Sequence, residues 1–252
     1  MHPLDYRGCI FNALREVECM NVVEQYNLTL QIEVLKEQSA ETLARLCNLV
    51  EGSGTSDCVE LLKAYSHIVN TELYLATSIH ELDILKSDMV KLENTIKESL
   101  AQASHDISDI KETGDVQAIE SYSSEDFDKA LERTIDFLTF NKNISSTPRA
   151  VILGGQSGAG KTTIHRVKML ESKGNYIVID GDTYRAQHPY FRELQEKYGV
   201  NSVDYTKMFA GKMVEAVIDK LSSLKYNLII EGTLRSAAVP INTATLLKSK
   251  GY

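Results

Sequence analysis

Apolar residues recur at steps of three and four over most of residues 1–115, which predicts an all-helical region. We expect a short amphipathic helix over residues 6–19 and a longer one over residues 22–50. A glycine-containing turn at residues 52–56 precedes a third apolar stripe, and beyond Leu75 this stripe is typical of a coiled-coil seam. The pattern therefore predicts a helical bundle or hairpin.

From residue 150 onward, short apolar runs alternate with helical patterns. Strands are expected at residues 150–153, 176–180 and 226–231, and helices at residues 162–171, 191–198, 205–224 and 239–250. Residues 150–252 should therefore form a second domain, an α/β core with a parallel sheet wrapped by helices. Residues 116–149 are expected to connect the two domains through one helix, which starts at a capping box in residues 123–126 and ends before a loop at residues 141–148.

The first predicted strand runs into a glycine-rich stretch that reads Gly155, four residues, Gly160, Lys161 and Thr162. This is the complete P-loop pattern between a strand and a helix, and its backbone N–H groups are suited to cradling phosphates. Lys161 would reach the β- and γ-phosphates and the Thr162 hydroxyl would ligate Mg²⁺. The stretch predicts a nucleotide site formed by Gly155, Gln156, Ser157, Gly158, Ala159, Gly160, Lys161, Thr162 and Thr163.

Acidic residues follow both of the other predicted strands, at the sheet edge where α/β proteins bind ligands. Asp182 is placed to accept a proton from a substrate hydroxyl, and Asp180 to bond a Mg²⁺-bound water, but their spacing leaves these two roles interchangeable. Glu231 resembles a Walker-B acid and Arg235 could bind phosphate. These residues favour a kinase.

Two histidines in this half, His165 and His188, are predicted to be hydrogen-bonded structural groups, because phosphoryl transfer already has a candidate base among the acids.

Composition narrows the classes of function further. With 43% hydrophobic and 25% charged residues in 252, the chain is typical of a soluble globular protein. A formal net charge of −8 argues against a general nucleic-acid binder. The chain has no apolar run of membrane-spanning length and no signal-peptide pattern at its start. Four cysteines without C-x-x-C spacing indicate reduced, mostly buried thiols in a cytoplasmic protein.

Four successive motifs, at residues 154–163 (GGQSGAGKTT), 179–189 (IDGDTYRAQHP), 226–235 (YNLIIEGTLR) and 239–244 (VPINTA), resemble those of the zeta-toxin family. The resemblance runs from about residue 119 to residue 252. It implies a bacterial toxin of a toxin–antitoxin system, an ATP-dependent kinase that phosphorylates the 3′-hydroxyl of UDP-N-acetylglucosamine and so blocks peptidoglycan synthesis.

The resemblance also assigns residues by position. Lys161 and Thr162 would serve ATP and Mg²⁺, and the family pattern resolves the choice between the two aspartates in favour of Asp182 as general base. It implies a sugar-nucleotide site lined by Asp182, Glu215, Glu231, Thr233, Arg235 and Thr243.

Two departures from the family pattern lead to further expectations. The helical residues 1–115 resemble the fused antitoxin of single-chain members, so we expect them to cover the P-loop and inhibit the kinase. The family's later strands and its arginine-bearing lid do not follow Tyr252, so we expect a core truncated at its C-terminus and an almost inactive chain. The rival interpretations are a different P-loop small-molecule kinase and a non-catalytic, nucleotide-dependent regulatory module.

Overall fold

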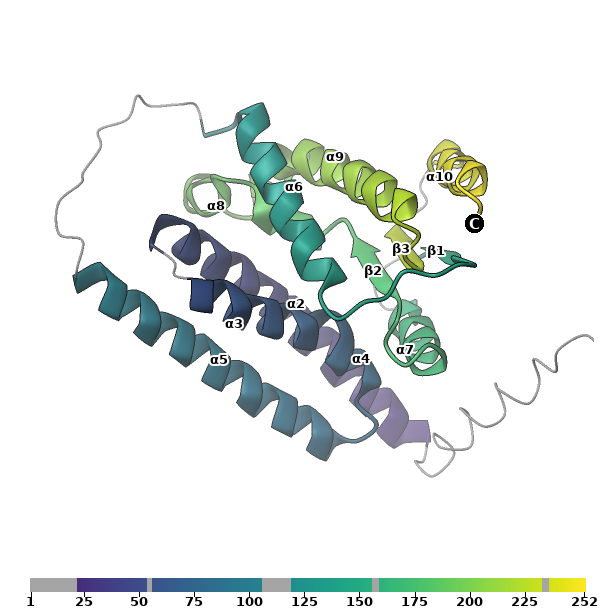
Figure 1. Ribbon diagram of the computed structural model, residues 1–252, viewed down its shortest axis with the longest axis horizontal. Coiled ribbons are helices and arrows are strands. Elements are labelled where there is room, and N and C mark those ends of the chain that lie inside the picture. The colour runs from purple at the N-terminus through teal and green to yellow at the C-terminus, as the bar shows by residue number, and fades with distance from the viewer. Residues whose placement is uncertain (1–21, 54–55, 106–118, 156–158, 233–235) are drawn as a thin grey trace, which may run out of the picture.

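A computed structural model describes residues 22–53, 56–105, 119–155, 159–232 and 236–252 (Figure 1). The helix expected over residues 6–19 and the end of the third apolar stripe, at Ile107 and Ile110, lie outside these residues. The described chain consists of a helical bundle beside an α/β unit, as the hydrophobic pattern predicts.

The α/β unit is built on three parallel strands, β1 (Ala150–Gly154), β2 (Ile177–Asp180) and β3 (Leu228–Gly232), in the order β1-β3-β2. All three predicted strands are confirmed to within two residues at each end. In the register of the sheet, Glu231 on β3 lies opposite Leu153 on one side and Asp180 on the other. The central strand therefore places its acid next to the acid of β2.

Helices cover both faces of this sheet (Figure 1). On one face, α6 (Ser124–Thr139), α9 (Ser202–Ser223) and α10 (Ala238–Ser249) pack on alternate strand residues such as Ile179 and Ile230. On the other face, α7 (Lys161–Glu171) packs through Met169 on the intervening residues Val178 and Ile229. Because strand side chains alternate between faces, both faces of these apolar strands are covered.

The remaining elements of this half follow β2. They are η2 (Thr183–Gln187), α8 (Phe191–Tyr198) and η3 (Gly199–Asn201), and they lead into α9. No helix in the described ranges is long and apolar enough to cross a membrane.

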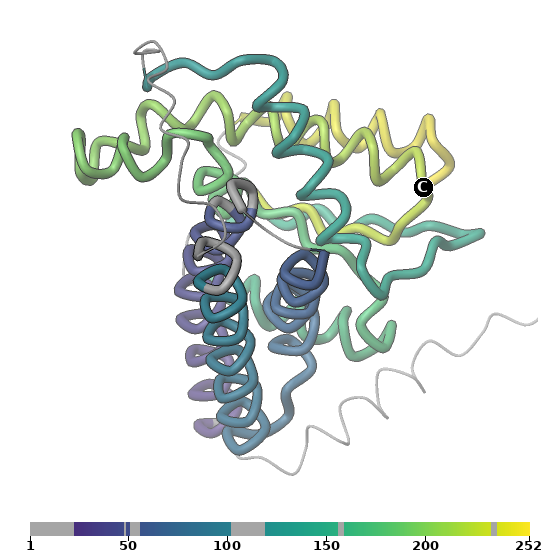
Figure 2. Tube along the Cα trace, turned by 60° about the vertical axis from the view of Figure 1, so that its left-hand side comes forward, coloured from purple at the N-terminus to yellow at the C-terminus, as the bar shows by residue number. Residues whose placement is uncertain are grey.

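The helical bundle comprises α2 (Val22–Ser53), α3 (Ser56–His67) and α5 (Ile79–His105), with η1 (Ile68–Glu72) and α4 (Leu73–Leu75) continuing α3. Figure 2 shows α2 and α5 side by side. The predicted seam of α5 is confirmed, since Leu82, Met89 and Ile96 recur at seven-residue steps and are all buried in the bundle core. Cys47 and Cys58 are buried free thiols in this bundle, as expected.

The third apolar stripe is not continuous in the structure, because the chain turns back between α4 and α5. The backbone N–H of Thr77 donates to Glu81 Oε2 at 2.7 Å, and the backbone N–H of Glu81 donates to Ser78 Oγ at 3.2 Å. The Ser78 hydroxyl thus satisfies a backbone N–H of the first turn of α5, and the Glu81 side chain binds back to the residue before Ser78. Local capping therefore starts a new helix within an apolar pattern that reads as uninterrupted.

The bundle and the α/β unit share their cores. Tyr74 of α4 is 1% exposed and packs with Leu153, Met169 and Ile229 under the sheet. In the other direction, Phe137 of α6 belongs to the bundle core, while other residues of α6 pack on the sheet. The segment that the sequence predicts as a connector thus packs into both halves.

Candidate functional site

The loop between β1 and α7 has the backbone that phosphate binding requires. Gly160 precedes α7 with φ +78°, and Gly155 has φ +150°, where a Cβ would lie 3.0 Å from Ala159 Cβ. Both conformations favour glycine. Three predicted binding residues of this loop, Gln156, Ser157 and Gly158, lie outside the described residues.

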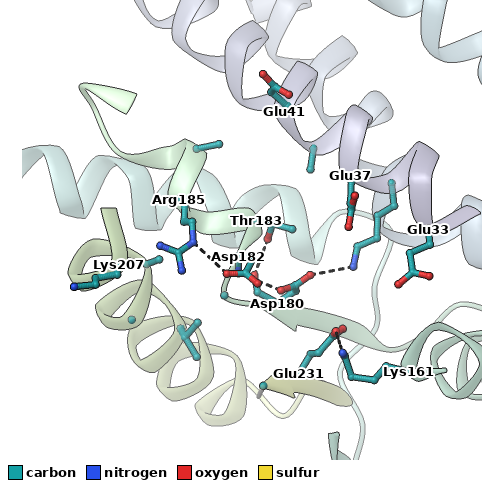
Figure 3. Close-up of a pocket in the computed structure, with 18 of the residues that line it drawn as sticks. Glu33, Glu37, Glu41, Lys161, Asp180, Asp182, Thr183, Arg185, Lys207 and Glu231 are labelled. Atoms are coloured by element: carbon teal, nitrogen blue, oxygen red, sulfur yellow. Dashed lines mark hydrogen bonds and ion pairs between the residues drawn. The ribbon is translucent and has the colours of Figure 1, made fainter. Parts of the chain in front are cut away.

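Lys161 and Glu231 face each other across the mouth of the loop (Figure 3). Lys161 Nζ lies 3.3 Å from Glu231 Oε1 and donates to the carbonyl oxygen of Gly155 at 3.0 Å. Burial and the neighbouring Asp180 carboxylate raise the pKa of Glu231, and nearby lysines oppose this shift. Thr162 follows with a buried side chain, whereas Thr163 is exposed on the first turn of α7.

His165 lies behind this pair and differs from the prediction. Its side chain is buried against the ring of Tyr74, and its Nε2 is 3.3 Å from Glu231 Oε2 without forming a hydrogen bond. Burial, helped by the charges of Lys36 and Lys161, lowers the pKa of His165 to about 4, so the ring is neutral at pH 7. The expectation of a hydrogen-bonded His165 is therefore wrong, because ring packing replaces the hydrogen bonds.

His188 is structural, as predicted. It accepts a hydrogen bond from Tyr190 N–H at 3.2 Å and lies edge-on to the rings of Tyr122 and Phe209.

The two aspartates after β2 have different surroundings. Asp180 accepts the backbone N–H of Asp182 at 3.1 Å, and its side chain is 22% exposed. The Asp182 side chain is 82% exposed and lies 3.1 Å from Arg185 Nε through its Oδ1. Asp182 therefore presents its carboxylate to the open side of the site.

These residues line one cavity of about 710 Å³. Its floor contains Gly155, Lys161, Thr162, Asp180, Asp182 and Glu231, from all three strand ends. A second cationic group lies beyond Asp182, where Arg185 and Lys207 line the same cavity (Figure 3).

Helix α2 of the bundle forms the facing wall of the cavity (Figure 3). Its glutamates Glu33, Glu37 and Glu41 recur every four residues and all line the cavity, because residues four apart share a helix face. Between them, Lys36 Nζ reaches Asp180 Oδ2 at 3.3 Å. The expected cover over the P-loop is thus an acidic helix with one inserted lysine.

Polar contacts also fix the bundle to α7. Arg166 donates to Thr29 Oγ1 at 3.0 Å and to the carbonyl oxygen of Ala76 at 2.7 Å. A further bond joins the bundle to the loop after α6, where Lys142 donates to Thr71 Oγ1 of η1 at 2.7 Å. The two Arg166 bonds hold α7, and with it the P-loop, against α2 and the turn before α5.

Not every predicted site residue is brought to the cavity. Glu215 is exposed on α9 and Thr243 is half-buried on α10, and neither is among the described residues that line it. Thr233 and Arg235 lie outside the described residues. Conversely, sequence reasoning missed Lys36 and the three glutamates of α2. Their four-residue spacing is readable, but it does not show which surface the helix faces.

Comparisons with known proteins match the helical bundle and the α/β unit to two different families. Residues 131–252 match the family model for zeta toxin, and residues 24–99 match that for bacterial epsilon antitoxin. Toxin PezT of Streptococcus pneumoniae is 59% identical over 134 residues, 53% of this chain and 53% of that protein. Toxin zeta of Streptococcus pyogenes is 42% identical over 134 residues, 53% of this chain and 47% of its own length.

A solved chain from the PezAT chromosomal toxin–antitoxin system of Streptococcus pneumoniae is similar in structure. It superimposes with a TM-score of 0.52 at 59% sequence identity, covering 53% of this chain and 56% of that one. The chain spans about half the length of these relatives.

Proposed function

We propose that this chain is a toxin kinase fused to its own inhibitor, because residues 131–252 match the zeta-toxin family model and residues 24–99 match the epsilon-antitoxin family model. The single observation that supports this most is the shared cavity: its floor is the P-loop edge of the toxin domain and its facing wall is α2 of the antitoxin domain. The two matched segments thus meet at the place where nucleotide would bind.

The proposed reaction transfers the γ-phosphoryl group of ATP to the 3′-hydroxyl of UDP-N-acetylglucosamine. Lys161 would bind the phosphates, and Asp182 would accept the hydroxyl proton as the new O–P bond forms. Arg185, 3.1 Å from Asp182, would orient that carboxylate. The acceptor itself comes from the zeta-toxin resemblance rather than from the geometry of the cavity.

The residues at this edge fit a Mg²⁺ ion. The Thr162 hydroxyl and the carboxylates of Asp180 and Glu231 line the same cavity, and they are oxygen donors, which Mg²⁺ prefers. Bound with ATP, the ion would neutralise charge on the β- and γ-phosphates. A few carboxylates beside substrate phosphates are the usual Mg²⁺ site in phosphoryl-transfer enzymes.

Inhibition would follow from the position and the charge of α2. The helix forms the wall of the cavity that faces Lys161, and the row Glu33, Glu37 and Glu41 would repel the phosphates of a nucleotide entering the cavity. Nucleotide would therefore bind more weakly with α2 docked than with α2 moved away.

The test is turnover of ATP and UDP-N-acetylglucosamine, followed by phosphorus NMR of the sugar nucleotide. The full chain is compared with the chain lacking residues 1–115 and with full-length Arg166→Ala, which loses the hydrogen bonds from α7 to α2 and to the turn before α5. We expect the altered chains to be faster than the unaltered one. If neither alteration changes ATP binding or turnover, α2 is not an inhibitor.

The same assay separates the rival functions. Phosphorylation of another hydroxyl compound, with UDP-sugars unbound, would indicate a different small-molecule kinase. A biological effect that survives Asp182→Ala but not Lys161→Ala would indicate a nucleotide-dependent regulatory module without catalysis.

A further inference from the structure

Lys36 is unusual among the α2 residues that line the nucleotide cavity, because it is the only cation among them. Its side chain is 14% exposed, and its Nζ lies 3.3 Å from Asp180 Oδ2 and 5.6 Å from the centre of the Tyr74 ring. The antitoxin domain thus places one buried positive charge at the strand edge of the toxin domain.

That edge requires a positive charge. Asp180 and Glu231 are cross-strand neighbours, so their carboxylates repel each other. With α2 docked, the ammonium of Lys36 lies 3.3 Å from Asp180 Oδ2 and offsets this repulsion.

We propose that Lys36 is a built-in substitute for the divalent cation: with α2 docked, its ammonium occupies the cation position at Asp180 and Glu231. The divalent ion and docked α2 then exclude each other from this edge. The inference rests on the proposed function in one respect, namely that the edge binds a divalent cation.

The neighbours of Lys36 indicate that its ammonium takes the place of a divalent cation, rather than only forming an ion pair between α2 and the sheet. Glu33 and Glu37 lie on either side of Lys36 in the sequence, and all three line the cavity. A bound metal–nucleotide complex also presents anionic oxygens around a central cation to the same groups of the protein. The docked helix thus brings carboxylates to the cavity where a nucleotide would bring phosphates, and it offers Asp180 an ammonium in place of the metal.

Mutual exclusion has a reciprocal consequence. If docking of α2 weakens divalent-ion binding by some factor, the ion weakens docking by the same factor. The cation concentration would then regulate how tightly the inhibitor is held, independently of the repulsion between α2 and nucleotide.

The test uses the full chain and Mn²⁺ in place of Mg²⁺, without nucleotide, with free Mn²⁺ measured by electron paramagnetic resonance. Lys36→Gln should gain a Mn²⁺ site at least tenfold tighter than any at this edge in the unaltered chain. Lys36→Arg, which keeps the charge, should bind like the unaltered chain. So should Lys86→Gln, which removes an exposed lysine of α5 that pairs with Asp83.

The double variant Lys36→Gln, Asp180→Asn locates the effect. The proposal requires the gained site to disappear, and it is overturned if the gain persists. It is equally overturned if Lys36→Gln binds Mn²⁺ no more tightly than the unaltered chain.

A second measurement needs no substitution and covers the case in which Lys36→Gln does not fold. Adding Mn²⁺ to the unaltered chain should speed hydrogen exchange in α2 relative to α5, which does not line the cavity. Unchanged exchange in α2 at saturating Mn²⁺ would overturn the proposal. Neither measurement involves phosphoryl transfer, so a failure of the kinase assay and a failure of the Lys36 proposal are distinguishable.

Discussion

Asp180 and Asp182 are two residues apart at the end of β2, yet they are suited to different roles. Asp180 is engaged by the ammonium of Lys36 and by a backbone N–H, and its side chain is largely covered. Asp182 pairs with Arg185 and opens onto the cavity. Spacing alone makes the two interchangeable, whereas these surroundings favour Asp182 as the base, which agrees with what the family resemblance implies.

This difference predicts separable effects of two substitutions. In the Arg166→Ala chain, in which inhibition by α2 should be relieved, Asp182→Asn should lower turnover of UDP-N-acetylglucosamine about 10²-fold or more, because the proposed general base is lost, and should leave nucleotide affinity unchanged. Lys161→Ala should weaken binding of a fluorescent ATP analogue. Asp88→Asn, at an exposed aspartate on α5 that pairs with Lys91, serves as control. Normal turnover by Asp182→Asn would rule out this base.

The buried histidines predict a loss of stability in mild acid. Burial lowers the pKa of both His165 and His188 to about 4, below the ordinary value of 6.5. As the pH falls, the histidines of the unfolded chain therefore take up protons before those of the folded chain. Their contribution to the free energy of unfolding is fully present above pH 6.5 and is lost between pH 6.5 and pH 4. At pH 5 each histidine should lower the free energy of unfolding by about 2 kcal/mol.

Urea unfolding of His188→Phe tests this value, since phenylalanine suits the aromatic cluster of Tyr122, Phe127 and Phe209. Between pH 7 and pH 5, the variant should lose about 2 kcal/mol less than the unaltered chain. The comparison uses the pH dependence, so a constant difference in stability cancels. Equal losses in the two chains would show that His188 does not carry the effect.

How far the site can be predicted from sequence depends on where its residues come from. The P-loop and the acids after β2 and β3 follow from local patterns, since a strand end fixes where its next residue lies. Lys36 cannot be found in this way, because its place at Asp180 depends on how a helix from 144 positions earlier docks. The exposure of Glu215 is likewise set by which face of α9 turns toward the sheet.

At the scale of elements, apolar periodicity locates the described helices and strands well, because the residues that are buried recur with the period of the helix or strand to which they belong. It fails at residues 76–78, where apolar spacing continues but capping by Thr77, Ser78 and Glu81 starts a new helix. A polar cap depends on one or two residues, whereas apolar periodicity is read over many residues, so the periodicity does not reveal the cap. Both signals point the same way at α6, where the predicted capping box is confirmed.

That capping box gives a direct prediction. Ser123 Oγ accepts the N–H of Asp126 at 3.0 Å, and the Asp126 carboxylate accepts the N–H of Ser123 at 3.0 Å. Ser123→Ala should lower the free energy of unfolding by about 1 kcal/mol, because the first turn of α6 loses its cap. The exposed neighbour Ser124 is the control, since Ser124→Ala should change stability little. Chemical denaturation of both variants measures the difference, and equal midpoints would contradict the role of the cap.

At the scale of the molecule, the helical bundle does more than line the cavity. Tyr74 lies in the same buried cluster as residues from β1, α7 and β3, and Arg166 ties α7 to α2. The sequence divides the chain correctly into a helical and an α/β half. It does not reveal this shared core, because Tyr74 belongs to the helical pattern of its own half and its partners lie more than 75 positions later.

Tyr74→Ala should therefore destabilise both halves together. Removing a buried aromatic ring of this size costs about 3–5 kcal/mol, since the cavity left behind lies between the two halves. Hydrogen exchange should speed up in β3 as well as in α2, and the thermal midpoint should fall. Tyr26→Ala, at a tyrosine of α2 that is 67% exposed, controls for loss of a ring without loss of packing. If exchange rises in the bundle alone, the α/β unit holds its sheet without help from the helical bundle, and the two halves are stable independently.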